Sequence, residues 1–226
     1  MSVLESPEPT REDRRWTLRL GAALAVAALV LHLPGLVGRL FNSDEASLAT
    51  MAMEIQRGGT LYHETADRKP PVVPYVYALV FEATGRRDLR PVRAVGALAL
   101  AGTALLLAGE AKRRRGTRAA AVAAGVFFLA GTAANFPADS QAAGFETFML
   151  LPMTGAVVAA GRGQAVVAGL CLALACLCKQ TAFVTALPVA YLLVRAGGWP
   201  AAARAGAAAA GVIVATAVAF GPADFL

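Results

Sequence analysis

Long apolar segments separated by short polar ones constrain the fold of this chain more than any other feature. Hydrophobic residues make up 57% of the 226 residues and charged residues only 16%, a composition outside the usual range of soluble domains. A helix needs about 20 mainly apolar residues to cross a bilayer. The windows that approach this length are 16–37, 91–111, 119–134, 147–160, 165–177, 182–194 and 205–220. The sequence therefore predicts an all-α, polytopic membrane helix bundle with about seven transmembrane helices.

The charges beside these windows predict their orientation. The basic run at 112–115 follows the second window, and such runs stay in the cytoplasm. We therefore expect residues 1–15 to be a cytoplasmic tail, 16–226 to be one transmembrane domain, and 42–90 to be its first extracytoplasmic loop. The first window lacks a cleavage site and is expected to be retained. The net charge of +6 follows this topology and not one polar face, so it does not indicate nucleic acid.

The first outer loop carries the signals of a short amphipathic helix. Asn42 is a suitable N-cap and the glycines at 58–59 are a suitable stop, which predicts a helix of about 14 residues. Its apolar residues recur at helical spacing and predict one face against the membrane or the bundle. On this periodicity Asp44 falls on the apolar face, and Glu45 and Glu54 lie to its two sides.

A second short helix is predicted directly after this one. Pro70 favours an extended conformation for Lys69, and Pro71 suits the first turn of a helix that runs to about Thr84. At about 1.5 Å per residue this helix is too short to span a bilayer, so we expect both helices to be interfacial. Tyr75 and Tyr77 suit that level.

Several of these motifs together resemble a known family. The sequence contains SDEA at 43–46, KPP at 69–71, an E-x-F segment at 146–148 and KQTA at 179–182. This set resembles the bacterial branch of the polyprenyl-phosphate-sugar glycosyltransferases of the GT-C fold, which includes protein O-mannosyltransferases and lipid A aminoarabinose transferases. The resemblance implies transfer of a sugar from a polyprenyl-phosphate donor to a glycan, lipid or protein acceptor. It also implies an active site on the extracytoplasmic side of a bacterial plasma (inner) membrane.

The resemblance also implies roles for charged residues of the first outer loop. Asp44 would be the general base for the acceptor hydroxyl, and Glu45 would share this work or orient the base. Lys69 would bind the donor phosphate. The alternatives are a helix-start charge for each acid and an interfacial cation without a special role for the lysine.

Charged residues further along the chain are weaker candidates. Glu146 and Asp139 lie in the second outer loop and would contact the acceptor or a metal, with an ordinary helix-start acid as the alternative. Lys179 lies between apolar windows and needs a partner, which is donor phosphate or an acid of the first loop, unless the side chain snorkels to the surface. The sequence leaves divalent-metal dependence open, and His32 is interpreted as structural. Four arginines are expected to contact lipid headgroups, with donor phosphate as the alternative: Arg86, Arg87, Arg90 and Arg93.

Two other classes of function fit parts of this pattern. Interrupted apolar segments are also found in transporters, so a multi-pass transporter or a lipid-binding membrane subunit without catalysis is the alternative, followed by a silent scaffold. Family members are usually considerably longer. We therefore expect this chain to correspond to the N-terminal half of an enzyme whose remaining part is supplied by further sequence or by a partner.

Overall fold

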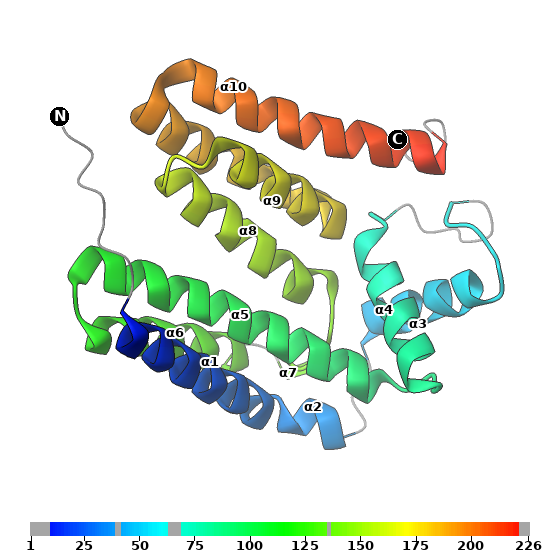
Figure 1. Cartoon of the computed structure of the whole chain (residues 1–226). Coiled ribbons are helices and arrows are strands. Elements are labelled where there is room, and N and C mark those ends of the chain that lie inside the picture. Colours follow the sequence, from blue (N-terminus) through cyan, green and yellow to red (C-terminus); the bar gives the residue numbers. More distant parts are fainter. Residues whose placement is uncertain (1–9, 39–41, 63–68, 135–136, 222–226) are drawn as a thin grey trace.

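The computed structural model describes residues 10–38, 42–62, 69–134 and 137–221. Within these ranges the secondary structure is helical and contains no strand, which confirms the all-α class. In chain order the elements in Figure 1 are α1 (Arg11–Leu31), α2 (Leu33–Val37), α3 (Ser43–Gln56), α4 (Val72–Thr84), α5 (Leu89–Arg115), α6 (Arg118–Ala133), α7 (Pro137–Ser140), α8 (Phe145–Gly161), α9 (Ala165–Cys178), the 3₁₀ helix η1 (Gln180–Thr185) and α10 (Ala186–Phe220).

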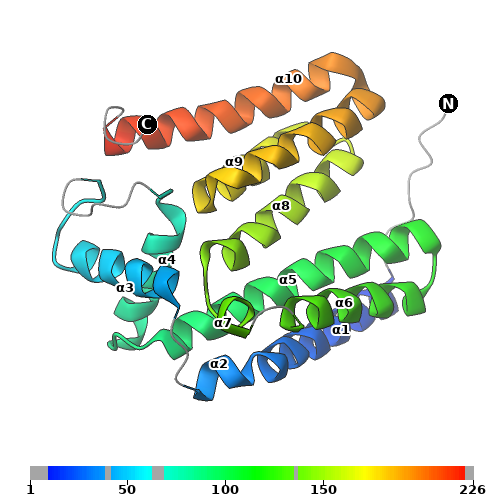
Figure 2. The same ribbon diagram turned by 180° about the vertical axis from the view of Figure 1, so that it is seen from behind.

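The helices form a bundle in which α5 is central. It contacts α1, α6 and α8, while α9 packs against both α8 and α10. Figures 1 and 2 both place α3 and α4 together at one end of the bundle, and the junction of α5 with α6 at the other end. The two helices of the predicted outer loop, α3 and α4, therefore cover one end of the bundle.

Helix α10 reverses direction within its length. Gly197 and Gly198 have non-helical backbone angles, and Gly198 has a φ of 71°, which is accessible to glycine at little cost. Pro200 follows directly. Figure 1 shows the two arms running back along each other, so the turn predicted between the last two windows is present.

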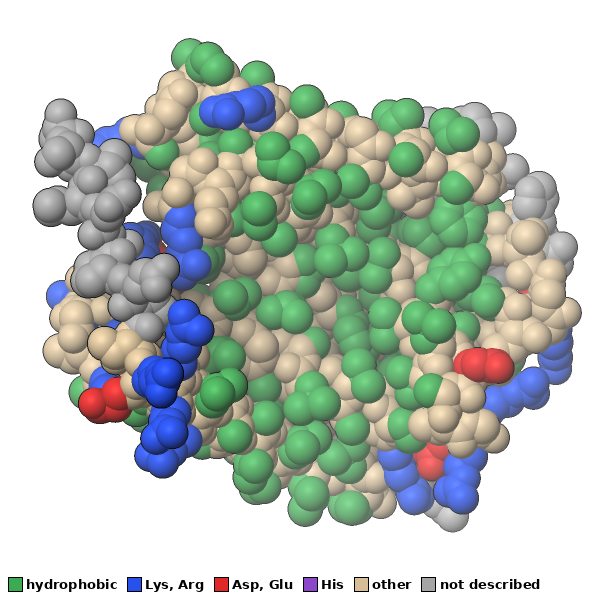
Figure 3. Space-filling view, viewed as in Figure 1, with side chains coloured by type: hydrophobic (Ala, Val, Ile, Leu, Met, Phe, Trp, Pro, Cys, Tyr) green, Lys and Arg blue, Asp and Glu red, His purple; other side chains and the backbone are tan. Residues whose placement is uncertain are grey.

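The apolar helices indicate a membrane protein. Leu89–Arg115 and Gln180–Phe220 are long and apolar enough to cross a membrane, and the second of these contains the reversal in α10. Shorter apolar helices include α6, α8 and α9. Figure 3 shows apolar side chains over the middle of the molecule, with charged ones gathered towards its ends, a pattern typical of membrane proteins. Seven crossings stay a prediction.

The two short helices of the first outer loop begin and end as their sequence signals predicted. Helix α3 has 14 residues, and Oδ1 of its N-cap Asn42 accepts hydrogen bonds from the two backbone N–H groups that follow Ser43. Gly58 has a φ of 88° directly after the helix. Pro71 is the N-cap of α4. Both helices lie where the sequence predicted them, with Pro71 as the N-cap of α4 and not within its first turn, and their position at a membrane interface stays a prediction.

One buried cluster ties α3 and α4 to the bundle. Leu48 and Met51 of α3 pack with Phe81 of α4 and with Phe145 at the start of α8. Burial of each such side chain contributes roughly 1.5–3 kcal/mol. This packing fixes the N-terminal end of α3 near that of α8, where the charged candidates gather.

Ion pairs join the helices at the opposite end of the bundle. Nζ of Lys112 on α5 lies 2.7 Å from Oδ1 of Asp13 on α1, and Arg118 of α6 lies 2.8 Å from Glu12. Lys112 holds the pKa of Asp13 below its ordinary value by hydrogen bonding to the carboxylate. The start of α1 and the basic end of α5 therefore share one end, as the topology requires.

Candidate active site

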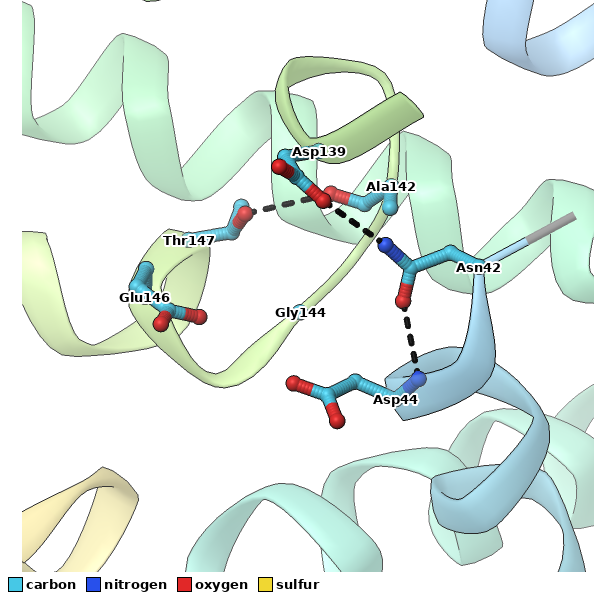
Figure 4. A pocket seen from close by; sticks show the side chains of 7 residues that line it. All are labelled: Asn42, Asp44, Asp139, Ala142, Gly144, Glu146 and Thr147. Atoms are coloured by element: carbon cyan, nitrogen blue, oxygen red, sulfur yellow. Dashed lines mark hydrogen bonds between the residues drawn. The ribbon is translucent and has the colours of Figure 1, made fainter. Parts of the chain in front are cut away.

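Two adjoining cavities lie where the N-terminal ends of α3 and α8 meet the segment before α4. The acidic cavity, about 370 Å³, is lined by Asn42, Asp44, Asp139, Ala142, Gly144, Glu146 and Thr147 (Figure 4). The basic cavity, about 190 Å³, is lined by Asp44, Lys69, Pro70, Phe145, Lys179, Gln180 and Thr181. Asp44 lines both cavities, so its carboxylate stands between a chamber rich in acids and a chamber that holds two lysines.

Asp44 is positioned by the cap of α3. Oδ1 of Asn42 accepts a hydrogen bond from the backbone N–H of Asp44 at 2.9 Å, and Nδ2 of Asn42 donates to Oδ1 of Asp139 at 3.1 Å. The Asp44 side chain is 44% exposed, and its Oδ1 lies 3.1 Å from Nζ of Lys69. Figure 4 shows this carboxylate directed towards Glu146 across the acidic cavity. A partly exposed carboxylate can receive a proton from a bound hydroxyl.

The buried acid of α3 is Glu45, and the prediction that Asp44 lies on the buried apolar face was wrong. Glu45 is fully buried. Its Oε1 accepts a hydrogen bond from the backbone N–H of Ala143 at 2.7 Å, and its Oε2 accepts one from Nη2 of Arg93 at 2.6 Å. Residues far away in the chain cover this side of α3, which the helical period alone does not report. These contacts of Glu45 anchor the start of α3, and with it the neighbouring residue Asp44.

Arg93 does not contact lipid headgroups as expected, because it is buried at the start of α5. Its side chain is 5% exposed, and its Nη1 donates to the backbone carbonyl of Gly35 at 2.5 Å. Arg86, Arg87 and Arg90 are exposed, and their contact with headgroups stays a prediction. The signal for a buried role was present in the sequence, since a charge within an apolar window needs a partner.

Contacts to both its backbone and its side chain position Lys69. Its carbonyl oxygen accepts a hydrogen bond from the hydroxyl of Tyr62 at 3.0 Å, and its Nζ lies 4.8 Å from the ring centroid of Phe145, a cation–π contact. Tyr62 has a left-handed φ of 77°, and its ring meets that of Phe220 edge to face at 5.7 Å. The end of α10 therefore supports the segment that carries Lys69. No local pattern in the sequence indicates this contact between Tyr62 and Phe220.

Among the described residues Lys179 pairs with Glu146 of the second outer loop, whereas the prediction named an acid of the first loop or donor phosphate. Helices α8 and α9 are antiparallel neighbours joined by a short turn, so the residue after α9 lies beside the first turn of α8. The Lys179 side chain is 32% exposed and that of Glu146 is 56% exposed. The pair therefore stays accessible to a ligand from solution.

Tyr77 braces the loop between α7 and α8. It is fully buried within the protein, and its hydroxyl donates to the carbonyl of Ala143 at 2.8 Å. Burial raises the pKa of Tyr77, so the hydroxyl stays protonated as a donor. Together with Glu45, it fixes both backbone polar groups of Ala143.

Among the described residues, no group of three His, Cys, Asp or Glu side chains is arranged to hold a metal ion. His32 is buried, and its Nδ1 lies 2.8 Å from the carbonyl oxygen of Ala28 one turn earlier, in line with a structural role.

Comparison with known proteins gives one match. Residues 68–221 match the model of the family described as dolichyl-phosphate-mannose-protein mannosyltransferase. Neither the curated proteins nor the solved structures contain a match. Lys69, Asp139, Glu146 and Lys179 lie within the matched residues, and Asp44 and Glu45 precede them.

Proposed function

The chain belongs to the dolichyl-phosphate-mannose-protein mannosyltransferase family, and we propose on this basis that Asp44 and Lys69 catalyse sugar transfer from a polyprenyl-phosphate donor. The family indicates a membrane glycosyltransferase of the GT-C type and implies such a donor and an acceptor. The observation that carries the residue assignment is the position of Asp44 between the acidic and the basic cavity.

In the proposed reaction an acceptor hydroxyl attacks the anomeric carbon of the donor sugar. The bond between this carbon and the phosphate oxygen breaks, and its electron pair leaves with the polyprenyl phosphate. The hydroxyl proton passes to the carboxylate of Asp44, which acts as general base. Attack on the face opposite the leaving phosphate inverts the anomeric carbon.

The basic cavity is the proposed place of the donor phosphate. Lys69 and Lys179 both line it, and two fixed cations stabilise the negative charge that grows on the departing phosphate. The apolar helices of the bundle offer a surface that a polyprenyl chain in the bilayer can contact. The acidic cavity is then proposed to receive the acceptor, with Glu146 and Asp139 as hydrogen-bond partners for its hydroxyl groups.

The proposed topology places this site outside the cytoplasm of a bacterial cell. The basic run that ends α5 lies with the start of α1 at one end of the bundle, while α3 and α4 lie at the other (Figure 1). Basic runs favour the cytoplasmic side. The acids and lysines of the two cavities then face the extracytoplasmic surface, where a lipid-linked donor and a polar acceptor can meet.

Asp44→Asn tests this proposal directly. The variant is expected to lower sugar transfer by at least about 100-fold, because a positioned general base contributes roughly 10²–10⁴ in rate. The measurement is transfer of labelled sugar from a polyprenyl-phosphate donor to the acceptors present in membranes that contain the full chain. Lys69→Ala is expected to raise the KM for the donor.

Glu54→Gln is the matched control. Glu54 lies on the same helix and pairs with Arg57 at its far end, so its replacement removes the same charge without touching either cavity. It should retain full activity at equal expression. Turnover by Asp44→Asn equal to that of Glu54→Gln would rule out Asp44 as the base.

A further inference from the structure

We infer that the two lysines of the basic cavity form a single phosphate site that Asp44 and Glu146 compete for, so that donor binding displaces these carboxylates and releases Asp44 to act as base. The inference rests on the proposed function and adds to it an order of binding, in which the lipid donor precedes the acceptor.

The geometry pairs each lysine with a carboxylate from a different element. Nζ of Lys69 lies 3.1 Å from Oδ1 of Asp44 at the start of α3, and Lys179 pairs with Oε1 of Glu146 at the start of α8. Both lysines line the basic cavity, whereas Asp44 and Glu146 also line the acidic cavity next to it. Each carboxylate can therefore leave its lysine by turning into a space that it already borders.

These ion pairs are open to exchange. The four side chains are between 32% and 56% exposed, and ion pairs at such exposure contribute little to stability because solvent screens them. A phosphate group brings several charged oxygens and can accept charge-assisted hydrogen bonds from both lysines at once. One bound phosphate can therefore replace both carboxylates as the partner of the two lysines.

Exchange also follows from the repulsion between like charges. A phosphate bound to Lys69 lies close to the carboxylate of Asp44, and two anions at contact distance oppose each other's ionised state. Rotation of Asp44 towards the acidic cavity relieves this repulsion. The base is then released from Lys69 only when the donor phosphate is in place, while its pairing with Lys69 leaves it less available to abstract a proton.

If the two carboxylates compete with the phosphate for the lysines, removing a carboxylate should tighten phosphate binding. Removing a residue that binds the donor should weaken it. Asp44→Asn removes the competing charge while its backbone N–H still donates to Oδ1 of the N-cap Asn42, so it should tighten the binding of a phosphate lipid. Glu146→Gln should do the same at Lys179. Lys69→Met should weaken the binding.

The experiment uses the full chain in nanodiscs of neutral lipid and a polyprenyl monophosphate without sugar as the probe. The dissociation constant of this probe is measured by native mass spectrometry or thermophoresis, with thermal unfolding of each variant as a check of the fold. We expect Asp44→Asn and Glu146→Gln each to lower the dissociation constant about three- to tenfold, in line with the weak pairs that they remove. Lys69→Met should raise it at least about tenfold.

A double variant separates exchange at Lys69 from general charge repulsion. In the Lys69→Met background, Asp44→Asn should tighten binding less than it does in the wild type, because there is no shared cation left to compete for. Repulsion through space would persist in that background. Glu54→Gln, which removes a carboxylate from the same helix, should leave the dissociation constant unchanged, as should Asp44→Asn towards a polyprenol without phosphate.

The outcomes distinguish this inference from the proposed function. Unchanged or weaker binding by Asp44→Asn and Glu146→Gln, with a clear loss in Lys69→Met, would overturn the exchange and leave the phosphate site in place. No effect of Lys69→Met on binding would instead overturn the assignment of the basic cavity to the donor phosphate, and the exchange with it.

Discussion

Arg93 donates to both carboxylate oxygens of Glu45, with 3.0 Å between Nε and Oε1 and 2.6 Å between Nη2 and Oε2. The pair is almost completely shielded from solvent. Glu45 also accepts from Ala143 before α8, and Arg93 donates to Gly35 of α2. One ion pair thus connects three helices and a loop, and it does so at the residue next to Asp44.

Glu45→Gln is expected to destabilise the protein by about 3–5 kcal/mol, because it leaves Arg93 as a buried charge without its counterion. Sugar transfer should fall together with stability, since the start of α3 loses its anchor. The measurement is thermal unfolding of the purified protein in nanodiscs alongside transfer activity.

Replacement of the partly exposed acid Glu54 by Gln is the control for this prediction, with an expected change within about 0.5 kcal/mol. A Glu45→Gln variant with wild-type stability but no transfer would contradict the structural role and return Glu45 to the chemistry itself.

Tyr62→Phe should weaken the use of the donor without changing the rate at saturation. The substitution removes the hydrogen bond to the carbonyl of Lys69, worth about 1 kcal/mol, while the ring can still pack on Phe220. The donor KM should therefore rise about fivefold at unchanged kcat.

Tyr75→Phe provides the comparison, because the ring of Tyr75 also contacts Phe220, at 5.9 Å between centroids. It should show wild-type KM. A fall in kcat with unchanged KM in Tyr62→Phe would mean that Tyr62 does not act through the position of Lys69.

Local signals in the sequence were sufficient for the elements that carry the site. The Asn42 cap, the glycines after α3 and the two prolines before α4 act within a few residues, so they predicted both helices of the first outer loop. The apolar windows likewise fall on helices. The turn expected between the last two windows, 182–194 and 205–220, lies at Gly197 and Gly198.

Contacts between distant segments decided what the sequence could not. Helical periodicity describes the faces of α3 without its neighbours in the fold. In the structure Ala143 and Arg93 contact one side of α3, and they bury Glu45, whereas Asp44 stays partly exposed. The contact of Tyr62 with Phe220 spans most of the chain and leaves no local pattern. The pairing of Lys179 with Glu146 depended on the antiparallel packing of α8 and α9, which a list of windows does not specify.

Gly35→Ala should disturb the site from a distance. A Cβ atom at this position would lie 2.6 Å from the backbone oxygen of Gln141, and the carbonyl of Gly35 accepts from Arg93. Either α2 or the loop before α8 must then move, at a cost typical of overpacking, about 1–3 kcal/mol. Thermal unfolding measures this cost, and the transfer rate should fall with it.

Gly109→Ala on α5 is the matched control, since a Cβ atom there meets no atom within 4 Å. Alanine in a helix interior is favoured over glycine by about 0.5–1 kcal/mol, so this variant should be as stable as the wild type or more so. Equal stability of the two variants would mean that α2 and the loop before α8 are not packed as described.

The orientation of the bundle is tested by single cysteines at Thr60 and Arg115, two exposed positions at opposite ends of the fold, in a background without the native cysteines. A membrane-impermeant maleimide should label Thr60→Cys in intact cells and Arg115→Cys only after permeabilisation. The physical reason is that the basic run at the end of α5 favours the cytoplasm, and the ion pair between Lys112 and Asp13 holds the start of α1 at the same end. Labelling of both positions in intact cells, or of Arg115→Cys alone, would overturn the orientation and with it the extracytoplasmic placement of Asp44 and Lys69.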